Sequence, residues 1–365
     1  MTRPWDIAVV GGGIMGCATA LGLAEGGMRV VVLDKGDLCQ GASGVNAGTL
    51  SLQIKRVSLM DYALRGHELW EAMGDAVGFR KTGGYTLAFT PREAALLEER
   101  QTLKRAAGAP ITFVSPKAVW AAEPGIADSV VAASYCPEDG YANSSLTGAY
   151  YRARLTEAGI AVRVRCPVEG VEASAGSFAL ATPDGPVRAA RLLLAGGAWL
   201  APLAAMLGVD LPVRARVNTV SVTEAMPALF STVIGHATGL LTMKQKPNGT
   251  VLIGGGWQGR GTPDAGRGQV SADTLAPNVA LACHAVPALQ DARLLRSWTG
   301  FEANVPDFYP LAGALGGVEG AYVLGCVRGG FTIGPYLGRL MADLILGRAP
   351  ERPLFDPNRS FEGDT

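Results

Sequence analysis

The first part of the chain alternates short apolar runs with glycines. Residues 6–10 read Asp-Ile-Ala-Val-Val and end at three successive glycines, residues 14–25 are rich in Ala and Leu, and residues 29–33 form a second apolar run. Short apolar runs bounded by glycine are typical of buried strands, and the longer Ala/Leu segment is typical of a helix. The pattern predicts a β-α-β unit whose apolar strands lie in a parallel sheet covered by helices.

Similar patterns continue along the chain. Helical spacing or composition predicts helices over residues 57–77, 91–107, 145–159 and 335–346. Apolar runs predict strands over residues 161–171, 191–195 and 321–324. A hairpin is expected at Pro247-Asn248-Gly249, and residues 83–90 have a hairpin-like pattern.

The order of these elements indicates an α/β chain with two interleaved domains. A chain of 365 residues exceeds the usual size of one core. We expect a Rossmann-like dinucleotide-binding domain, with a mostly parallel sheet, formed by residues 1–80, 136–212 and 300–365. An α+β substrate domain built on an antiparallel sheet is expected from residues 81–135 and 213–299.

The charge balance argues against several classes of partner. Lys and Arg number 32, Asp and Glu number 32, and hydrophobic residues make up 48% of the chain. This composition predicts a folded protein with no electrostatic footprint for nucleic acid. The longest apolar stretch, residues 192–209, is broken by Pro202 and three glycines, so it predicts a strand followed by a helix and no transmembrane segment.

The cysteines indicate the cellular compartment of the protein, and their spacing predicts no metal site and no redox-active pair. All six are scattered, with no C-x-x-C pair and no Cys/His metal spacing: Cys17, Cys39, Cys136, Cys166, Cys283 and Cys326. They read as reduced thiols, which are typical of the cytosol. Because the first strand begins at residue 6, we expect no signal peptide and a cytoplasmic protein, with peripheral membrane association left open.

The turn after the first strand carries the most specific motif. Gly11-x-Gly13-x-x-Gly16 opens the predicted helix, and Asp34 ends the second strand. Gly11 permits a tight turn, Gly13 lets backbone approach a pyrophosphate, Gly16 allows close packing, and Asp34 can accept hydrogen bonds from ribose hydroxyls. The motif predicts dinucleotide binding without separating FAD from NAD(P). A ligand-free tight turn is the alternative.

Four further segments carry a resemblance to a known family. They are residues 41–48 (Gly-Ala-Ser-Gly-Val-Asn-Ala-Gly), the strand around Val168, residues 192–199 (Leu-Leu-Leu-Ala-Gly-Gly-Ala-Trp) and residues 325–335 (Gly-Cys-Val-Arg-Gly-Gly-Phe-Thr-Ile-Gly-Pro). With the glycine motif, they resemble the D-amino acid oxidase-like superfamily of FAD-dependent amine and amino acid oxidoreductases. That superfamily includes glycine oxidase and the catalytic subunits of heteromeric sarcosine, opine and hydroxyproline oxidoreductases.

The resemblance implies FAD held without a covalent bond. Relatives that tether the flavin use a Cys just before the position of Pro306, and residues 300–305 contain none. The loop over residues 41–48 is expected to run along the flavin, and Val168 to meet the adenine. The expected cofactor-binding residues are Gly11, Gly13, Ile14, Met15, Gly16, Asp34, Lys35, Ala42, Ser43, Asn46, Ala47, Gly48, Thr49, Leu50, Val168, Ala195, Gly196, Gly197, Trp199, Arg328, Gly329, Gly330, Phe331 and Thr332.

The resemblance also implies a reaction: oxidation of the carbon-nitrogen bond of a small amine or amino acid, with hydride passing to flavin N5 and the imine hydrolysing. This chemistry needs no metal and no nucleophile, and the three histidines (His67, His236 and His284) show no ligand spacing. Arg328, beside the start of the last helix, would stabilise negative charge on the flavin. A glycine-rich turn with a surface Arg is the alternative.

The expected substrate residues are Thr242, Lys244, Trp257 and Glu302. Glu302 departs from the family pattern, because glycine oxidase-like relatives carry there an Arg that binds the substrate carboxylate. Either another cation takes that task, or the substrate is not a simple α-amino acid and Glu302 meets a cationic group. A surface-facing Glu302 is the third alternative. The candidate cations are Arg328, Lys55, Arg56 and Lys244.

Residues 46–56 resemble the opine and hydroxyproline branch, whose catalytic subunits work beside small partner subunits. This favours a hetero-oligomer, with oxygen, a quinone or a partner subunit as electron acceptor. Two alternatives stay open. One is an NAD(P)-dependent reductase, which would share the first 35 residues, and the other is a non-catalytic flavin-bearing subunit of an electron-transfer complex.

Overall fold

The chain folds into two compact units, each assembled from separated stretches of sequence. The computed structural model describes residues 3–174, 176–326 and 328–361. Unit 1 comprises residues 1–45, 144–216 and 301–365, and unit 2 comprises residues 46–143 and 217–300. The expected α/β class, with both parallel and antiparallel sheets, is confirmed.

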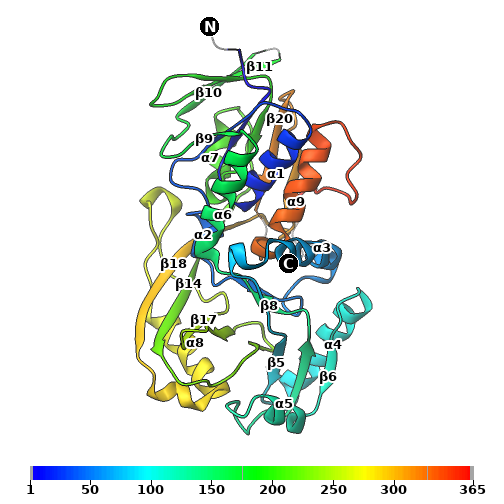
Figure 1. The fold of residues 1–365 in the computed structure, drawn as a ribbon, viewed down its shortest axis with the longest axis vertical. Coiled ribbons are helices and arrows are strands. Elements are labelled where there is room, and N and C mark those ends of the chain that lie inside the picture. Colours follow the sequence, from blue (N-terminus) through cyan, green and yellow to red (C-terminus); the bar gives the residue numbers. More distant parts are fainter. Residues whose placement is uncertain (1–2, 175, 327, 362–365) are drawn as a thin grey trace. The chain divides into compact units, whose positions relative to one another are not determined.

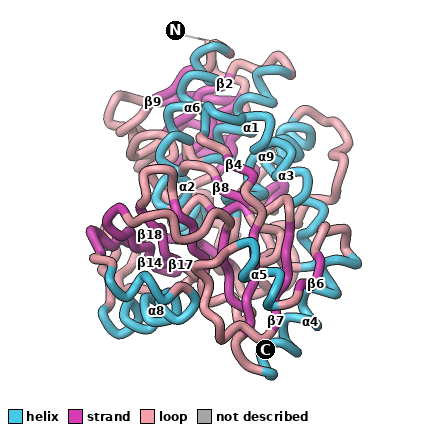
Figure 2. Tube along the Cα trace, turned by 60° about the horizontal axis from the view of Figure 1, so that its bottom comes forward, coloured by secondary structure: helices cyan, strands magenta, loops and turns pink. Residues whose placement is uncertain are grey.

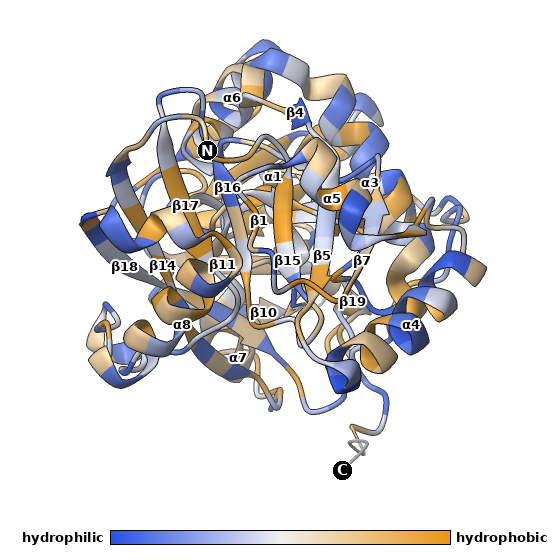
Figure 3. Ribbon diagram, turned by 90° about the horizontal axis from the view of Figure 1, so that it is seen from below, coloured by the Kyte–Doolittle hydropathy of each residue, from blue (hydrophilic) through white to orange (hydrophobic). Residues whose placement is uncertain are grey.

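Unit 1 is built on a six-stranded sheet. Its strands, in order across the sheet, are β19 (Leu311–Ala314), β20 (Ala321–Gly325), β13 (Leu192–Leu194), β1 (Ile7–Val10), β2 (Val30–Leu33) and β9 (Ala161–Arg163). All neighbouring strands are parallel except β19, which is antiparallel to β20. The residues of β1, β2 and β13 are all buried, which explains their unbroken apolar sequence (β1 is labelled in Figure 3).

Two helices far apart in sequence pack side by side in unit 1 (Figure 1). They are α1 (Ile14–Glu25), which follows β1, and α9 (Gly330–Ile345), which follows β20. Gly338 allows this approach, because a Cβ there would lie 2.5 Å from the Cβ of Ala18 and 3.0 Å from the backbone oxygen of Met15. The other α-helices that the structure describes in this unit are α2 (Ala42–Val45), α6 (Ser144–Glu157) and α7 (Leu200–Ala205).

Two boundaries in unit 1 differ from the sequence expectations. The predicted strand over residues 161–171 is wrong: β9 ends at Arg163, and Arg165 has a φ of 54°, which no strand accommodates. The chain resumes as β10 (Gly170–Ser174) in a separate antiparallel sheet with β11 (Ser177–Ala181) and β12 (Val187–Ala189). The last helix begins at Gly330 and not at Pro335, so Pro335 lies within it.

Unit 2 is built mainly on an eight-stranded sheet. Its order is β18 (Leu294–Asn304), β14 (Arg214–Ala225), β17 (Thr250–Gly254), β16 (Thr242–Gln245), β15 (Val233–His236), β5 (Gly84–Ala88), β7 (Ala132–Cys136) and β6 (Thr112–Val114), and Figure 2 shows β18, β14 and β17 as neighbours. The hairpin at residues 247–249 is confirmed, since β16 and β17 pair antiparallel on either side of it. The 83–90 segment forms no local hairpin, because β5 pairs with β15 and β7.

A small second sheet in unit 2 determines where this unit begins along the chain. It joins β3 (Thr49–Leu50), β8 (Gly140–Tyr141) and β4 (Arg80–Lys81). These short antiparallel pairings hold the 46–80 stretch beside residues 136–143 within unit 2. The sequence-based division had placed both stretches with the dinucleotide-binding domain.

Two helices of unit 2 agree closely with the sequence predictions, whereas two others were not predicted. The predicted 57–77 helix is α3 (Met60–Met73) flanked by two 3₁₀ turns, Val57–Leu59 and Gly74–Val77. A capping box starts α4 (Pro91–Ala106): Glu93 N–H donates to the Thr90 hydroxyl, and Thr90 N–H donates to the Glu93 carboxylate. This helix is largely hydrophilic (Figure 3). The remaining helices are α5 (Pro116–Ala122) and α8 (Ala272–Ala285).

Candidate functional site

In the glycine turn between β1 and α1, the surrounding protein leaves no room for a side chain at Gly11 and Gly16 but leaves room at Gly13. Gly11 has a φ of 114°, and a Cβ there would lie 2.3 Å from the backbone oxygen of Ala195. At Gly16 a Cβ would lie 2.0 Å from the Gly11 oxygen. At Gly13 it would meet only the Ser43 hydroxyl, at 3.3 Å. The protein itself therefore requires glycine at positions 11 and 16 but leaves space outside position 13.

The amides at the start of α1 form an open donor set. Ile14 N–H donates to the Ser43 hydroxyl at 3.1 Å. The amides of Gly13, Met15 and Gly16 have no protein acceptor in the described part of the chain, and the first turn of α1 contains no acidic residue. Unpaired N–H groups at the positive end of a helix are the elements that bind phosphate. These residues fit the pyrophosphate of a dinucleotide.

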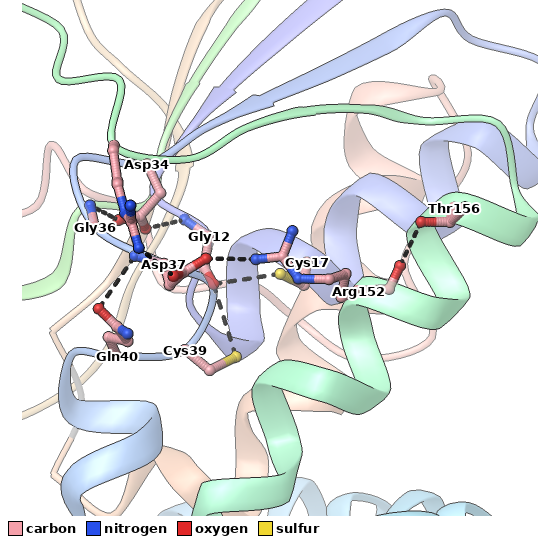
Figure 4. A network of polar contacts seen from close by, with 10 residues as sticks. Gly12, Cys17, Asp34, Gly36, Asp37, Cys39, Gln40, Arg152 and Thr156 are labelled. Atoms are coloured by element: carbon pink, nitrogen blue, oxygen red, sulfur yellow. Dashed lines mark hydrogen bonds and ion pairs between the residues drawn. The ribbon is translucent and has the colours of Figure 1, made fainter.

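Asp34 closes the other side of the turn (Figure 4). One carboxylate oxygen accepts the Gly12 amide at 2.7 Å, and the other accepts the Gly36 amide at 2.7 Å. Each oxygen keeps a second acceptor position, so the carboxylate remains able to accept ribose hydroxyls. The two amides fix its orientation before any ligand binds.

Two thiols lie beneath the same turn. Cys17 and Cys39 both donate to the Gly12 oxygen, at 3.3 and 3.7 Å (Figure 4). The hydrogen bond to Cys39 and burial raise the pKa of the Cys17 thiol well above its usual value. Cys17 is therefore an uncharged part of the core, and all six cysteines of the chain are free thiols.

The segment expected to run along the flavin is not a plain loop. Ala42, at its start, opens the single helical turn α2, and Asn46 follows that turn. Asn46 then accepts the Gly48 amide at 2.6 Å with its side-chain oxygen, which fixes the bend before β3. Thr49 and Leu50 form β3. The unit boundary falls between residues 45 and 46, so Ser43 belongs to unit 1, whereas Asn46, Ala47, Gly48, Thr49 and Leu50 belong to unit 2.

Val168 lies between β9 and β10 and not within a strand, which corrects the expectation for this residue. The chain just before it is held against the Asp34 turn, because Arg165 N–H donates to the Gly36 oxygen and Cys166 N–H donates to the Asp34 oxygen, both at 2.8 Å. Val168 therefore follows, by two residues along the chain, a backbone position that is hydrogen-bonded to Asp34.

After β13, the Gly196-Gly197 turn leads into a 3₁₀ helix over Gly197–Trp199. Trp199 stacks edge-to-face on Phe301 at 5.8 Å, and the Lys35 ammonium lies 3.3 Å from the centre of its ring. Lys35 and Trp199 are thus brought together by a cation-π contact.

The turn before α9 is strained and polar. Cys326 and Gly329 have φ values of 58° and 74°, and Val327 lies outside the described residues. The side chain of Glu302 accepts the Gly329 amide at 3.0 Å. It therefore holds one amide at the start of this helix, so it is not a free surface carboxylate. Arg328 is exposed.

The first turn of α9 contains the remaining expected cofactor residues, Gly330, Phe331 and Thr332. Thr332 is fully buried, and its hydroxyl has no hydrogen-bond partner among the described residues. A buried hydroxyl without a partner is costly, and a polar ligand group would satisfy it. This observation also fits a cofactor beside the turn.

Arg216 is a residue that the sequence analysis missed. Burial and the positive charge of Arg328 lower its pKa, and the charge of Glu302 opposes this shift. Three charged groups of unit 1, two guanidiniums and one carboxylate, thus influence one another. No local sequence signal marks Arg216, which comes from the start of β14.

The expected substrate residues of unit 2 lie on or beside the β16–β17 hairpin. Thr242 and Lys244 are both buried on β16, and the Trp257 indole donates to the Leu240 oxygen at 2.6 Å. Lys244 Nζ donates to the Thr49 hydroxyl at 2.5 Å. The structure therefore brings together Lys244, which was expected to contact the substrate, and Thr49, which was expected to contact the cofactor. Of the other candidate cations, Lys55 is buried and Arg56 is exposed.

A buried polar network in unit 2 was also missed. The Asp139 carboxylate accepts the Leu52 amide at 2.8 Å, the Ser51 hydroxyl at 2.5 Å and the Gln53 side-chain amide at 3.1 Å. Lys104 donates to the Gln53 backbone oxygen. This network holds the stretch after β3 in a fixed conformation.

Comparison with known proteins decides the family. The family model DAO, described as FAD dependent oxidoreductase, matches residues 6–344. The chain belongs to this family. It is 30% identical to the glycine oxidase of Geobacillus kaustophilus (strain HTA426) over 358 residues, covering 94% of each chain. It is 29% identical to an opine oxidase subunit of Rhizobium meliloti, covering 89% of each. A crystal structure of glycine oxidase from Geobacillus kaustophilus superposes with a TM-score of 0.89 at 27% identity, covering 98% of this chain and all of that chain.

Membership of the DAO family confirms two expectations from the sequence. The chain is an oxidoreductase, and its cofactor is FAD, so the NAD(P)-dependent alternative is set aside. The residue roles given above remain predictions. In the described ranges no helix is both long and apolar enough to cross a bilayer, and no three His, Cys, Asp or Glu side chains there gather into a metal-binding group.

Proposed function

We propose that this DAO-family chain oxidises the carbon-nitrogen bond of a small amine or amino acid. The relatives named as a glycine oxidase and an opine oxidase subunit support this reaction class. The observation on which the proposal rests most is the set of amides at Gly13, Met15 and Gly16 that have no acceptor in the described part of the chain, because such amides would hold the pyrophosphate of the cofactor. When bound, FAD supplies the two-electron acceptor for a hydride from the carbon next to nitrogen.

The chain's own residues would position that cofactor. Amides of Gly13, Met15 and Gly16 would hold the pyrophosphate, and Asp34 would accept the ribose hydroxyls. The Thr332 hydroxyl and the start of α9 would donate to the flavin end. No cysteine occurs in residues 300–305, which supports non-covalent attachment.

The charges of Arg216, Arg328 and Glu302 bear on the substrate. Two guanidiniums against one carboxylate leave a net positive charge, which suits a substrate carboxylate. We propose that Arg328 and Arg216 replace the arginine that relatives carry at the position of Glu302. Glu302 would then orient this group through the Gly329 amide and not meet the substrate directly.

The named relatives leave the substrate and the assembly as proposals. The opine oxidase relative is named as one subunit of an assembly, and we propose that this chain also works beside a partner subunit. A secondary amine or imino acid is then the preferred substrate. The cytoplasmic location is retained as a prediction.

Anaerobic mixing tests the reaction. The FAD-loaded protein is mixed separately with glycine, sarcosine, D-amino acids, proline derivatives and opines, and the visible flavin absorbance is followed. Bleaching by one class supports the proposal and identifies the substrate, and admitting air separates an oxidase from a dehydrogenase. If no amine bleaches the flavin, alone or with a co-purified partner, the chain is a non-catalytic flavin-bearing subunit and the proposal is wrong.

A further inference from the structure

Lys244 is buried in unit 2, with no acidic partner among the residues that the structure describes. It lies on β16, between β17 and β15, and only 1% of its surface is exposed. Its ammonium nitrogen has one hydrogen-bond partner in the described ranges, the hydroxyl of Thr49, and lies 6.0 Å from the centre of the Tyr141 ring. A charged lysine has three hydrogens to satisfy, so this environment favours the neutral amine.

The neighbouring charges act in the same direction. Lys246, two residues further along the chain, places its nitrogen 4.1 Å from the centre of the same Tyr141 ring. Burial, and then the charge of Lys246, lower the pKa of Lys244 well below its usual value. Burial and the charge of Arg80, on β4, lower the pKa of Lys246 to about 8. No carboxylate of the described residues opposes these effects at Lys244, so its nitrogen carries a free lone pair more often than that of an exposed lysine.

Thr49 connects this nitrogen with the proposed flavin segment. It directly follows Gly48, stands opposite Tyr141 in the β3–β8 pair, and is only partly buried. Thr242 lies on the same face of β16 as Lys244, and a Cβ at its partner Gly254 would come within 3.8 Å of Ala47. A hydroxyl can accept one proton while it donates another. Thr49 therefore gives the buried lysine a connection to the segment formed by residues 46–49.

We infer that Thr49 and Lys244 form a proton relay that removes the proton from the ammonium group of the substrate. The inference rests on the proposed function, since an amine is largely protonated at neutral pH and must be neutral to lose hydride from its carbon. The substrate N–H bond breaks, and Thr49 Oγ1 takes that proton while passing its own to the lone pair of the neutral Lys244 amine, which requires that amine to turn its lone pair toward the hydroxyl. Lys244 becomes an ammonium that donates to Thr49. No electrons are exchanged in this step, and the charge moves from the substrate to the lysine.

The first test measures the rate of flavin reduction against pH in anaerobic stopped flow, using the amine that bleaches the flavin. Lys244→Met keeps an unbranched buried side chain without a basic nitrogen. We expect reduction at pH 7 to fall by about 100-fold or more. The rate should recover about tenfold per pH unit as the solution supplies the neutral amine directly.

Matched variants separate a relay from a structural role. Thr49→Val, which removes only the hydroxyl, should reproduce the loss, and Thr49→Ser should restore the rate. Lys246→Met should move the limb of the profile that reports Lys244 to higher pH, because it removes the positive charge that lowers the pKa of Lys244. Lys104→Met changes another buried lysine of unit 2 and should leave the profile in place.

A second test needs no turnover. The chain has seven lysines, so lysine labelled with ¹³C at Cε gives a simple spectrum, and the signal missing from Lys244→Met is that of Lys244. We expect this signal to titrate well below the usual lysine pKa of about 10.4. Titration at the usual value, or an unchanged pH profile in both Thr49→Val and Lys244→Met, would overturn the relay. If no amine reduces the flavin at all, the proposed function fails instead.

Discussion

Gly13 and Gly16 belong to one motif, but the structure predicts opposite results when each is changed to alanine. At Gly16 the new Cβ would lie 2.0 Å from the Gly11 oxygen, whereas ordinary contacts begin near 3.4 Å. Helix α1 must therefore move away from the turn. Overpacking of this kind costs about 1–3 kcal/mol, and the better helix propensity of alanine returns less than about 1 kcal/mol. Gly16→Ala should lower the stability of the protein even without FAD.

At Gly13 the new Cβ would meet only the Ser43 hydroxyl, at 3.3 Å, and the backbone φ of −74° suits alanine. Gly13→Ala should therefore leave the FAD-free protein about as stable as the unmodified chain. The methyl group would instead occupy space needed by the pyrophosphate. We expect FAD to bind at least tenfold more weakly, a loss of about 1.4 kcal/mol or more.

Two measurements on each variant check this pair. Urea unfolding of FAD-free protein gives the stability, and titration with FAD followed by flavin fluorescence gives the Kd. If Gly13→Ala were as unstable as Gly16→Ala, or bound FAD with an unchanged Kd, the position assigned to the phosphates would be wrong.

The remaining predictions concern packing, pH and charge. Gly338→Val should destabilise the α1–α9 contact by about 1–3 kcal/mol in thermal unfolding, whereas Arg339→Val, on the exposed side of the same helix, should change stability by no more than about 0.5 kcal/mol. Burial lowers the pKa of His67 from 6.5 to about 4, so its neutral form stabilises the fold above pH 6.5, and about 3 kcal/mol should be lost as the pH falls from 6.5 to 4. Urea unfolding across this range should show a flatter pH dependence for His67→Gln than for the unmodified protein; equal slopes in the two proteins would contradict the assignment. Arg328→Ala should slow flavin reduction and leave FAD bound, and unchanged reduction kinetics would remove Arg328 from the mechanism.

Local sequence signals predicted the part of unit 1 whose contacts join residues that are close together in the sequence. The strand, glycine turn, helix and second strand over residues 6–34 form one continuous motif, so the sequence predicted that Asp34 ends the second strand, and the structure adds its hydrogen bond with the Gly12 amide. The α4 start was equally readable, because Thr90 and Glu93 lie three residues apart. In both cases each contact is made by neighbours in sequence or within one supersecondary unit.

What the sequence did not reveal depends on distant partners. The two-residue strands β3, β4 and β8 have no periodicity to detect, yet their pairing places residues 46–80 in unit 2. Val168 was expected in a strand because valines recur at positions 162, 164, 168 and 171, but β9 ends at Arg163 and Arg165 has a positive φ. Arg216 and Tyr141 interact with charged groups more than 80 residues away in sequence, and no local pattern predicts such contacts.

The order of strands in unit 1 has a consequence for synthesis of the protein. β1 is made first, but it is flanked by β13, and β13 is in turn completed by β20, near the far end of the chain. The glycine turn leaves the ribosome hundreds of residues before α9, the helix that packs against α1. At about 5–20 residues per second, the nascent chain spends tens of seconds with a half-built nucleotide fold. Cofactor loading is therefore expected only after β20 and α9 have been made.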